Sequence, residues 1–334
     1  MGGFGTVDWI HRDSKWLFIT LSIIFRMLAG VGSSFIGVSV YAMVAIKWPD
    51  EVTKKIAILE AANGAGLFIG PVFGGLIFQW TFYCMPFFVF SLILLAILPF
   101  IWWNLDTSLD STETDSLVDS TEKVTTFNLL KHKRIFFAFI AHFFNSVVFT
   151  FADPILEPRL KKDMGVTNSA LIGLIFGLPV IAYVLTGPFL MAPLTKHWVK
   201  RSIIQSGFLV FGVSLLLVGP SAVLHFGENL YLMLLGMFTI GVAAAFTVIP
   251  IIPEMLEAVD GKFADKGKVK DVSSGIFNMA NGLGQVAGPL SAGALKTKVG
   301  FAYTTDIFAL ILTTFFFVYF IACEGPTSFI KSIR

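Results

Sequence analysis

Carboxylates placed inside long apolar segments are the residues of this sequence best suited to chemistry. Asp153 and Glu157 stand four residues apart in FTFADPILEPRL, and Glu254 and Glu257 stand three apart in TVIPIIPEMLEAV. Helical spacing puts the members of each pair on one helix face. An acid inside a membrane is costly, so it typically pairs with a cation or carries a proton. Each pair therefore indicates a site for a cationic ligand or a proton.

Each of these acids also has a simpler interpretation. Glu157 precedes basic residues, which is typical of a solvated helix end, and we prefer that interpretation for it. For Asp153 we prefer a functional role. Glu254 and Glu257 come near the end of their segment and suit ordinary acids at the membrane surface equally well. Because Asp153 lies at the opposite end of its own segment, the acids predict two gates or a path between two faces, not one compact site.

A cation and a further acid lie in the first two apolar segments. Arg26 stands about ten residues, or roughly 15 Å, into its segment. Glu60 lies at a comparable depth on the next, antiparallel segment. A buried charge needs a partner, so the sequence predicts that the two side chains approach each other. The alternative is an Arg26 side chain that extends to the membrane surface, with Glu60 at the interface.

Uncharged polar residues add to the expected binding site. His142 and Asn145 share a segment with Asp153 and could line a cavity, although a single histidine is more often part of the packing. Tyr183, in the following segment, is expected to bind substrate with them. The expected substrate-binding residues are Asp153, Glu254, Glu257, Asn145 and Tyr183, whereas Arg26, Glu60 and Glu157 are expected to serve in coupling or as structural charges.

Nine apolar segments must position these residues. They cover residues 16–46, 55–79, 82–103, 134–156, 168–192, 202–224, 229–252, 271–295 and 302–323. Each reaches the roughly 20 residues that cross a bilayer. Of the 334 residues, 55% are hydrophobic and 14% are charged, whereas soluble domains carry about 25% charged residues. The sequence thus predicts an all-α membrane protein.

One connection differs from the short ones around it. Residues 104–133 are acidic and rich in Ser and Thr before they turn basic, which is typical of a linker. We therefore expect a partial N-terminal bundle over 1–103, a cytosolic linker over 104–133 and a six-helix C-terminal bundle over 134–334. With alternating crossings, sixteen of the 24 Lys and Arg residues fall on the side of the C-terminus and seven on the other. Excess Lys and Arg mark the cytosolic side, so the C-terminus is expected to be cytosolic.

A glycine-proline pattern occurs twice. AANGAGLFIGPVFGG begins at residue 61 and MANGLGQVAGPLSAG at residue 279, an offset of 218 residues. Glycines at this spacing let helices approach closely, and a proline kinks its helix, so a packing role is expected. The expected packing residues are Gly64, Gly66, Gly70, Pro71, Gly75, Gly282, Gly284, Gly288 and Pro289.

The two copies occupy unequal places in the chain. The second lies in the fifth apolar segment after the linker, whereas the first lies in the second segment of the chain, and one segment follows each copy in its half. If the halves are duplicates, the first half lacks three helices. The sequence therefore predicts nine helices of a twelve-helix design, with the first three missing. A partner chain is one way to cover the faces that those helices would cover.

These motifs resemble a known family. GAGLFIGPVFGG is similar to the fifth-helix signature of major facilitator superfamily antiporters, and RMLAGVGSSF is similar to the fourth-helix motif. With GTVDWI, FADPILEP and VIPIIPEML, the resemblance narrows to the vesicular amine transporter group and its polyamine transporter-like branch. By this resemblance Asp153 matches a seventh-helix acid that faces the amine, Glu257 a tenth-helix acid implicated in coupling, and Glu254 the acid of the branch's PE pair. Asn278 stands where monoamine members have an eleventh-helix acid.

The resemblance implies a function in transport. We expect a major facilitator-type helical bundle that exchanges protons for organic cations, such as polyamines or monoamines, across a vesicular or other endomembrane. The expected partners are the lipid bilayer, a small organic cation and a proton, with no nucleic acid. No phosphate-binding loop, zinc spacing or nucleophile motif appears, so no enzyme, cofactor or metal site is expected. Two alternatives stay open: a superfamily carrier for another small organic solute, and a non-transporting truncated membrane protein or scaffold.

Overall fold

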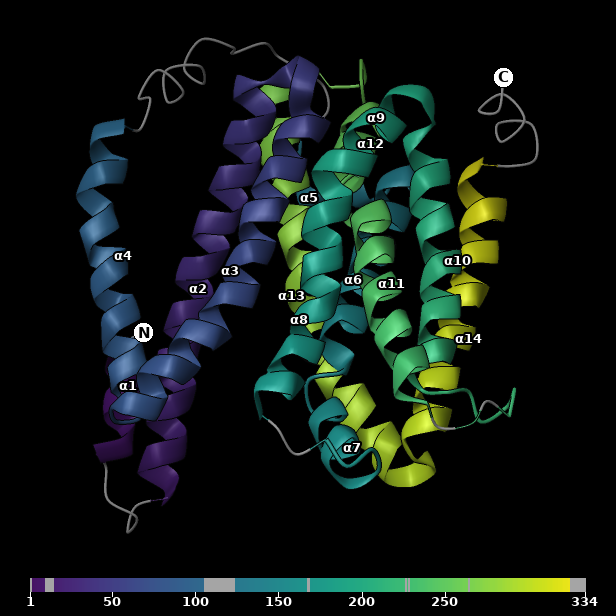
Figure 1. Ribbon diagram of the computed structural model, residues 1–334. Coiled ribbons are helices and arrows are strands. Elements are labelled where there is room, and N and C mark those ends of the chain that lie inside the picture. Colours follow the sequence, from purple (N-terminus) through teal and green to yellow (C-terminus); the bar gives the residue numbers. More distant parts are fainter. Residues whose placement is uncertain are drawn as a thin grey trace.

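Helices form most of the molecule in the computed structural model (Figure 1). It describes residues 2–9, 15–104, 124–166, 169–225, 227, 229–263 and 265–324. The long helices are α2 (Lys15–Lys47), α3 (Val52–Trp80), α4 (Met85–Asn104), α6 (Lys133–Phe151), α8 (Ser169–Thr186), α10 (Lys200–Val218), α11 (Leu230–Val248), α13 (Lys266–Val299) and α14 (Phe301–Tyr319). The short ones are α1 (Gly2–Gly5), η1 (Thr6–Trp9), η2 (Pro49–Glu51), α5 (Thr126–Leu130), α7 (Leu156–Lys162), η5 (Gly187–Met191), α9 (Ala192–His197), α12 (Ile251–Ala258) and η6 (Phe320–Glu324).

Seven helical stretches of the described residues are long and apolar enough to cross a membrane. They are Lys15–Lys47, Met85–Asn104, Lys133–Lys162, Leu171–Met191, Lys200–Val218, Leu230–Ala258 and Phe301–Cys323. Helices α3 and α13 add 29 and 34 residues and run beside these stretches (Figure 1). Each therefore reaches the roughly 20 residues that a crossing requires. The expected number of nine crossings stays a prediction, and most of the acidic segment before α5 lies outside the described residues.

Prolines decide where two of the long stretches break. The turn between α6 and α7 contains Pro154, and α12 begins after Pro250. A proline lacks the backbone N–H that would continue the helical ladder, which accounts for both breaks. By contrast, Pro179 and Pro289 lie inside α8 and α13, which continue through them.

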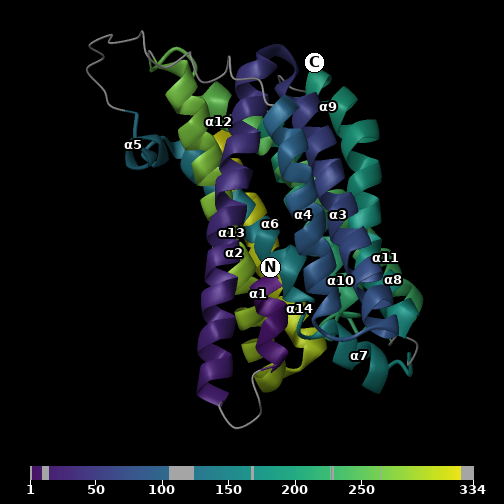
Figure 2. The same ribbon diagram turned by 90° about the vertical axis from the view of Figure 1, so that its left-hand side faces the viewer.

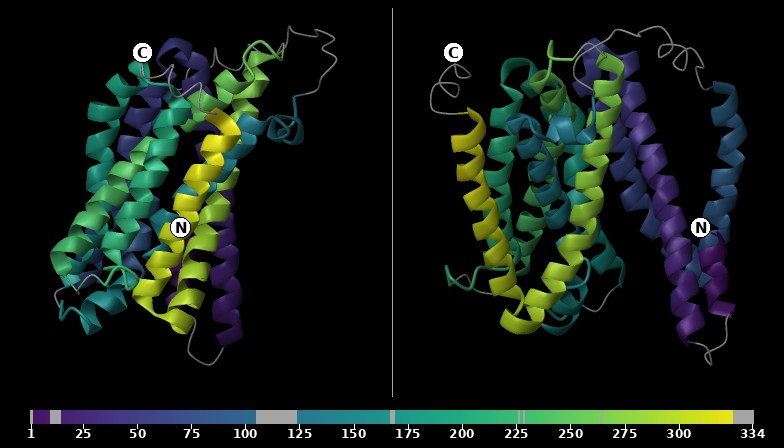
Figure 3. Two further views of the ribbon diagram at one scale, coloured as in Figure 1. Left: turned by 90° about the vertical axis from the view of Figure 1, so that its right-hand side faces the viewer. Right: turned by 180° about the vertical axis from the view of Figure 1, so that it is seen from behind.

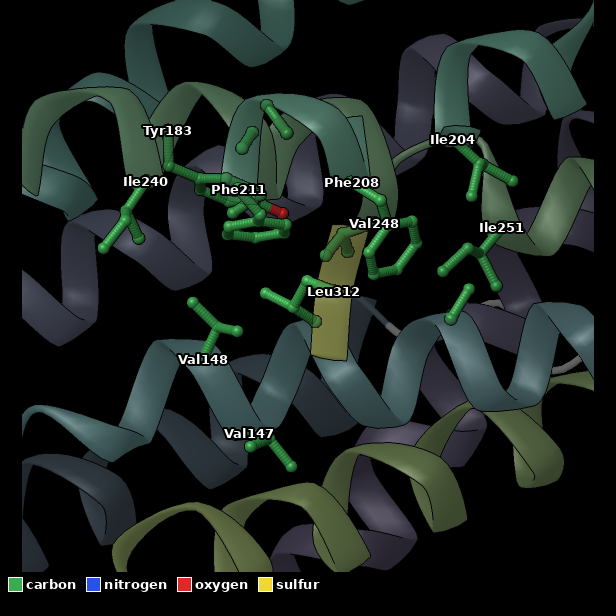
Figure 4. Close-up of a cluster of buried hydrophobic side chains, with 14 of the residues drawn as sticks. Val147, Val148, Tyr183, Ile204, Phe208, Phe211, Ile240, Val248, Ile251 and Leu312 are labelled. Carbon is green, nitrogen blue, oxygen red and sulfur yellow. The ribbon is translucent and has the colours of Figure 1, made fainter. Parts of the chain in front are cut away.

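Most of the core lies among the helices after residue 124. Figure 4 shows side chains from different helices meeting there, among them Val148 of α6, Phe208 and Phe211 of α10, Ile240 of α11 and Leu312 of α14. All five are buried. Because the membrane interior gives apolar side chains no reason to avoid lipid, close packing supplies much of the attraction between such helices.

Helices α2, α3 and α4 pack less completely. Helix α3 lies along α8 and α2 lies along α13, whereas α4 meets mainly α1 and α3. Figure 2 shows α2 and α3 in front of the bundle, and Figure 3 shows α4 standing apart from α2 along most of its length. No described residue in the apolar windows of α2 and α4 is buried inside the molecule. Their apolar side chains are therefore available to lipid.

The two glycine-proline copies pack differently. A Cβ added at Gly284 would lie 2.6 Å from the Phe143 carbonyl oxygen, and one at Gly288 would lie 2.6 Å from that of Val147. Only glycine allows α13 to approach α6 this closely. In the first copy, a Cβ at Gly64 would lie 2.8 Å from Val184 of α8.

The remaining glycines of the pattern have free space in the structure. A Cβ added at Gly66, Gly70 or Gly282 would meet no heavy atom of another element within 4 Å. Thus Gly66 and Gly70 match Gly284 and Gly288 in sequence but not in contacts. The side chain of Pro71 and the surroundings of Gly75 lie outside the described part of the chain, so their packing role stays a prediction.

This difference makes a matched pair of variants informative. We expect Gly284→Ala to lower the free energy of unfolding by about 1–3 kcal/mol, because the added methyl overfills a packed contact. Gly66→Ala, at the equivalent position of the first copy, should have no cost, since alanine favours a helix by up to about 1 kcal/mol relative to glycine. Unfolding by denaturing detergent measures both. Equal losses in the two variants would contradict the packing assigned to Gly284.

Candidate functional site

A cavity of about 100 Å³ lies between the early helices and the bundle that follows. Helices α2 and α3 form one wall, and α6, α8, α11 and α13 form the others. The lining combines one carboxylate with hydroxyl, amide, imidazole and aromatic side chains. Its residues are Tyr41, Glu60, Asn63, Gly64, His142, Asn145, Ser146, Phe149, Thr150, Tyr183, Ala244, Val248, Phe277, Asn281 and Gln285.

Glu60 is the acid of this cavity, and it is 5% exposed. The hydroxyl of Tyr183 on α8 donates a hydrogen bond of 2.8 Å to Glu60 Oε2, and the hydroxyl of Tyr41 on α2 donates to Oε1. Asn63, one turn further along α3, also hydrogen-bonds the carboxylate. No Lys or Arg of the described residues forms an ion pair with Glu60. The carboxylate is therefore held by neutral donors.

The local sequence explains why Glu60 meets Tyr183. Gly64 follows Glu60 by four residues, so the two lie on the same face of α3. Because Gly64 has no side chain, the backbone of α3 comes close to Val184 on α8. Tyr183 is the residue before Val184 and lies within reach of the carboxylate. The first glycine copy thus positions the acid.

Aromatic rings form a second part of the wall. The ring of His142 stacks on that of Phe277, with centroids 3.8 Å apart and planes at 16°. Tyr41 contacts Phe277 as well, at a centroid distance of 4.9 Å. His142 is 3% exposed. The rings of His142, Phe277 and Tyr41 therefore form a continuous row of contacts that ends at Glu60.

Amide side chains on the opposite part of the wall are fixed by hydrogen bonds. The hydroxyl of Thr247 donates to Asn145 Oδ1 over 2.9 Å. Asn281 Oδ1 accepts from the Ser146 hydroxyl over 2.9 Å and from Gln285 Nε2 over 3.2 Å. These bonds join α6 to α11 and to α13. They also occupy the amide oxygens of Asn145 and Asn281.

The expected substrate-binding residues fall into separate places. Asn145 and Tyr183 line the cavity. Asp153 is exposed in the turn after α6. Glu254 and Glu257 lie on α12, and Glu254 contacts Arg134 at the start of α6. Since α6 separates the two groups of acids by its whole length, they do not form one compact site, in line with the sequence expectation.

The expected approach of Arg26 to Glu60 is wrong. The guanidinium of Arg26 lies over the ring of Phe4, 4.4 Å from its centroid. Glu60 instead contacts Tyr41, fifteen residues after Arg26 on α2 and so about 22 Å further along the helix axis. Arg26 lies 21 residues before the end of α2, whereas Glu60 lies eight residues after the start of α3, so the two side chains do not share a depth in this antiparallel pair.

Tyr41 is a site residue that the sequence reasoning missed. Two signals pointed to it. It is the single tyrosine of α2. It also stands six residues before the end of α2, and Glu60 stands eight residues after the start of α3. Those positions share one depth in an antiparallel pair.

Glu157 is exposed and receives a hydrogen bond of 2.6 Å from Lys161, as expected for a solvated helix end.

Comparison with known proteins places the fold. The family model of the Major Facilitator Superfamily matches residues 14–259 and again residues 138–331. The chain belongs to the major facilitator superfamily. The matches together cover nearly all of the described helices, so the expected all-α, major facilitator-type fold is confirmed.

Several curated superfamily members are similar to this one. The rat MFS-type transporter SLC18B1 is 30% identical over 310 residues, which is 91% of this chain and 65% of the relative. The mouse synaptic vesicular amine transporter is 25% identical over 295 residues, covering 86% of this chain and 53% of the relative. The chain thus spans about two thirds or less of the length of these relatives. They confirm the resemblance to the vesicular amine transporter group.

A solved superfamily structure agrees at the level of fold. The crystal structure of the human organic anion transporter MFSD10 superposes with a TM-score of 0.68 at 15% identity. It covers 95% of this chain and 74% of that chain. At this identity the likeness concerns helix arrangement alone.

This superfamily member holds a second buried acid in a different setting. The Glu254 side chain is 1% exposed, and its Oε1 lies 2.7 Å from Arg134 Nε and 3.7 Å from Arg201 Nε. Arg201 also donates to the Cys323 carbonyl oxygen over 2.7 Å. Nearby, Lys200 pairs with the exposed Glu257. The cluster ties the starts of α6 and α10 to α12 and η6.

The cluster predicts a strong effect of neutralising its buried member. Glu254→Gln should lower the free energy of unfolding by about 3–5 kcal/mol, because Arg134 and Arg201 lose their buried counter-charge. Glu257→Gln is the matched control and should cost less than about 1 kcal/mol, since its ion pair is solvent-exposed. Unfolding of the purified variants by denaturing detergent gives both values. A loss for Glu254→Gln as small as that for Glu257→Gln would show that the buried ion pairs of Glu254 do not hold these helices together.

Proposed function

We propose that this chain is a proton-coupled antiporter of organic cations, such as polyamines or monoamines, and that the cation binds at Glu60. The observation that carries the proposal is the buried carboxylate in an aromatic cavity between two groups of helices. A desolvated carboxylate without a cationic partner is costly. A bound ammonium group removes that cost by supplying the missing positive charge.

The surrounding groups suit an amine. Tyr41, Tyr183 and Phe277 line the cavity, and a cation near the face of such a ring gains about 0.5–2 kcal/mol. The two tyrosine hydroxyls hold the carboxylate in place without neutralising it. Asn145 and Gln285 add polar surface for the rest of the substrate. The site therefore combines one charge with an aromatic enclosure, which is the usual way to recognise an ammonium group.

A proton is the alternative occupant of the same carboxylate. When the amine leaves, the Glu60 carboxylate would remain as an unbalanced charge in a low-dielectric site. Protonation of the carboxylate removes that charge. The carboxylate then carries either a cation or a proton, and the two exclude each other. Exclusive occupation of one site, combined with rocking of the two helix groups about it, is sufficient for exchange.

The other acids fit a route through the molecule. Asp153 follows the cavity-lining Thr150 by three residues and is open to solvent. We assign it to the entrance on that side, where it attracts cations before they reach Glu60. Glu254 and Glu257 belong to the opposite end, where they act as a gate. The excess of Lys and Arg near that end supports a cytosolic orientation for it and for the C-terminus.

The vesicular assignment rests on relatives. The synaptic vesicular amine transporters of mouse and rat are 25% and 24% identical to this chain. Because the chain spans little more than half of their length, transport by the 334-residue chain itself is part of the proposal. A cation carried into an acidic vesicle against outward proton flow would match the exchange described above.

Uptake into proteoliposomes with an imposed pH gradient tests the proposal. We expect the 334-residue chain to accumulate radiolabelled spermidine or a monoamine only when the lumen is acidic. Glu60→Gln should reduce uptake roughly a hundredfold or more, since loss of one partner of a buried ion pair costs about 3–5 kcal/mol. Asp153→Asn should reduce uptake severalfold and mainly through the substrate concentration required, because it removes only an exposed charge.

The contrary outcomes separate the alternatives. Amine uptake that is lost in Asp153→Asn and kept in Glu60→Gln would move the binding site to the end of α6. Uptake of a different organic solute, without amine uptake, would indicate another superfamily carrier. Well-folded protein that takes up neither would support a non-transporting membrane protein. Glu157→Gln serves as the control variant, because that acid is exposed and paired with Lys161.

A further inference from the structure

His142 is a buried polar group whose hydrogen bonds are not made within the described chain. It is 3% exposed and lines the same cavity as Glu60. Neither Nδ1 nor Nε2 has a hydrogen-bond partner among the described residues. An unsatisfied buried polar group costs about 1–3 kcal/mol. An imidazole that lines a cavity with its hydrogen bonds unmade is suited to bind a ligand that enters the cavity.

The polar neighbours of His142 make their hydrogen bonds to other groups. Its ring is fixed by the parallel stack on Phe277, which leaves only the ring edges for hydrogen bonding. The amide oxygen of Asn145 on the same helix is used by Thr247, and that of Asn281 is used by Ser146 and Gln285. Tyr41, which contacts the other part of Phe277, donates to Glu60. Among the described residues that line the cavity, His142 is the one whose buried side-chain nitrogens have no hydrogen-bond partner.

A neutral imidazole offers one donor and one acceptor nitrogen. The acceptor requires a ligand with an N–H or O–H group. The aromatic rings and Glu60, taken alone, would suit a quaternary ammonium group as well as a protonated amine, because ring faces and charge attract both. His142 adds the element that distinguishes the two.

We propose that His142 is a second ligand of the bound cation and that it accepts a hydrogen bond from an ammonium N–H while Glu60 balances the charge. The site then selects protonated amines with at least one N–H over quaternary ammonium compounds of similar shape. This inference rests on the proposed amine site and names the substrate class within it. Loss of one hydrogen bond to a charged group should weaken binding about tenfold or more.

Three probes of graded methylation test this role on the 334-residue chain in lipid nanodiscs. They are spermidine, its tertiary-amine derivative, which keeps one N–H on each protonated nitrogen, and its quaternary derivative, which keeps none. Binding is measured by competition with radiolabelled spermidine. We expect wild type to bind the tertiary derivative at least about tenfold more tightly than the quaternary one. Since these two differ by only one methyl on each nitrogen, size contributes little to the ratio.

Substitutions of His142 should change this ratio and not only the affinity. His142→Phe and His142→Leu lack an acceptor and should reduce the preference for the tertiary derivative about tenfold. His142→Gln keeps an acceptor and should keep the preference. His197→Phe, an exposed histidine at the end of α9, is the matched control and should leave all affinities unchanged. Two apolar variants are used so that poor folding of one does not prevent the comparison.

The outcomes separate this inference from the function it rests on. Wild type that binds no amine overturns both. Wild type that binds amines with a ratio unaltered in His142→Phe and His142→Leu overturns the histidine alone, since a trapped water or packing would then explain the ring. A ratio lost equally in His142→Gln would also overturn it, because packing and not hydrogen bonding would set the preference.

Discussion

The structure depends on keeping one carboxylate out of water without a cation beside it. Glu60 lies where α2, α3 and α8 meet, and each helix helps to stabilise its buried carboxylate. Tyr41 and Tyr183 donate hydrogen bonds to it. Gly64 brings α3 close enough to α8 for the bond from Tyr183 to form. Hydrogen bonds to an ionised group offset part of the desolvation cost but leave its charge unbalanced. The early helices and the bundle are therefore joined through a group that is ready to accept positive charge.

Two of the buried acids among the described residues, Glu60 and Glu254, illustrate how the environment of a carboxylate determines its role. Glu254 is as buried as Glu60, yet two arginines surround it and neutralise it within the protein. Such a group stabilises the particular arrangement of helices that brings it to its arginines. Glu60 faces neutral donors and a cavity, so the balance of its charge must come from outside. Both acids stand in apolar segments of the sequence, and only their neighbours in space distinguish them.

Much of the fold could be predicted from the sequence because the bilayer sets helix length and proline sets the breaks. The apolar segments, the interruptions at Pro154 and Pro250, and the close packing of Gly284 and Gly288 all follow from local rules. The pairing of Glu60 could not, since it depends on how α2 and α3 are rotated and shifted against each other. A count of depth along each helix fixes neither the rotation nor the shift, and it led to Arg26 instead of Tyr41. The sequence singles out Asn145 and Tyr183, which line the cavity, because they are polar residues in apolar segments.

The contact between α6 and α13 has a mechanical consequence. Gly284 and Gly288 rest on the backbone of α6, and Ser146 of α6 is bonded to Asn281 of α13. The same stretch of α6 carries the cavity-lining face. Because backbone carbonyl groups and not flexible side chains form the contact, no side chains can rearrange there to let the two helices slide past each other. The two helices therefore form one rigid unit. A motion that changes the shape of the cavity must move both of them together. Relative movement is then confined to the helices on the other side of Glu60.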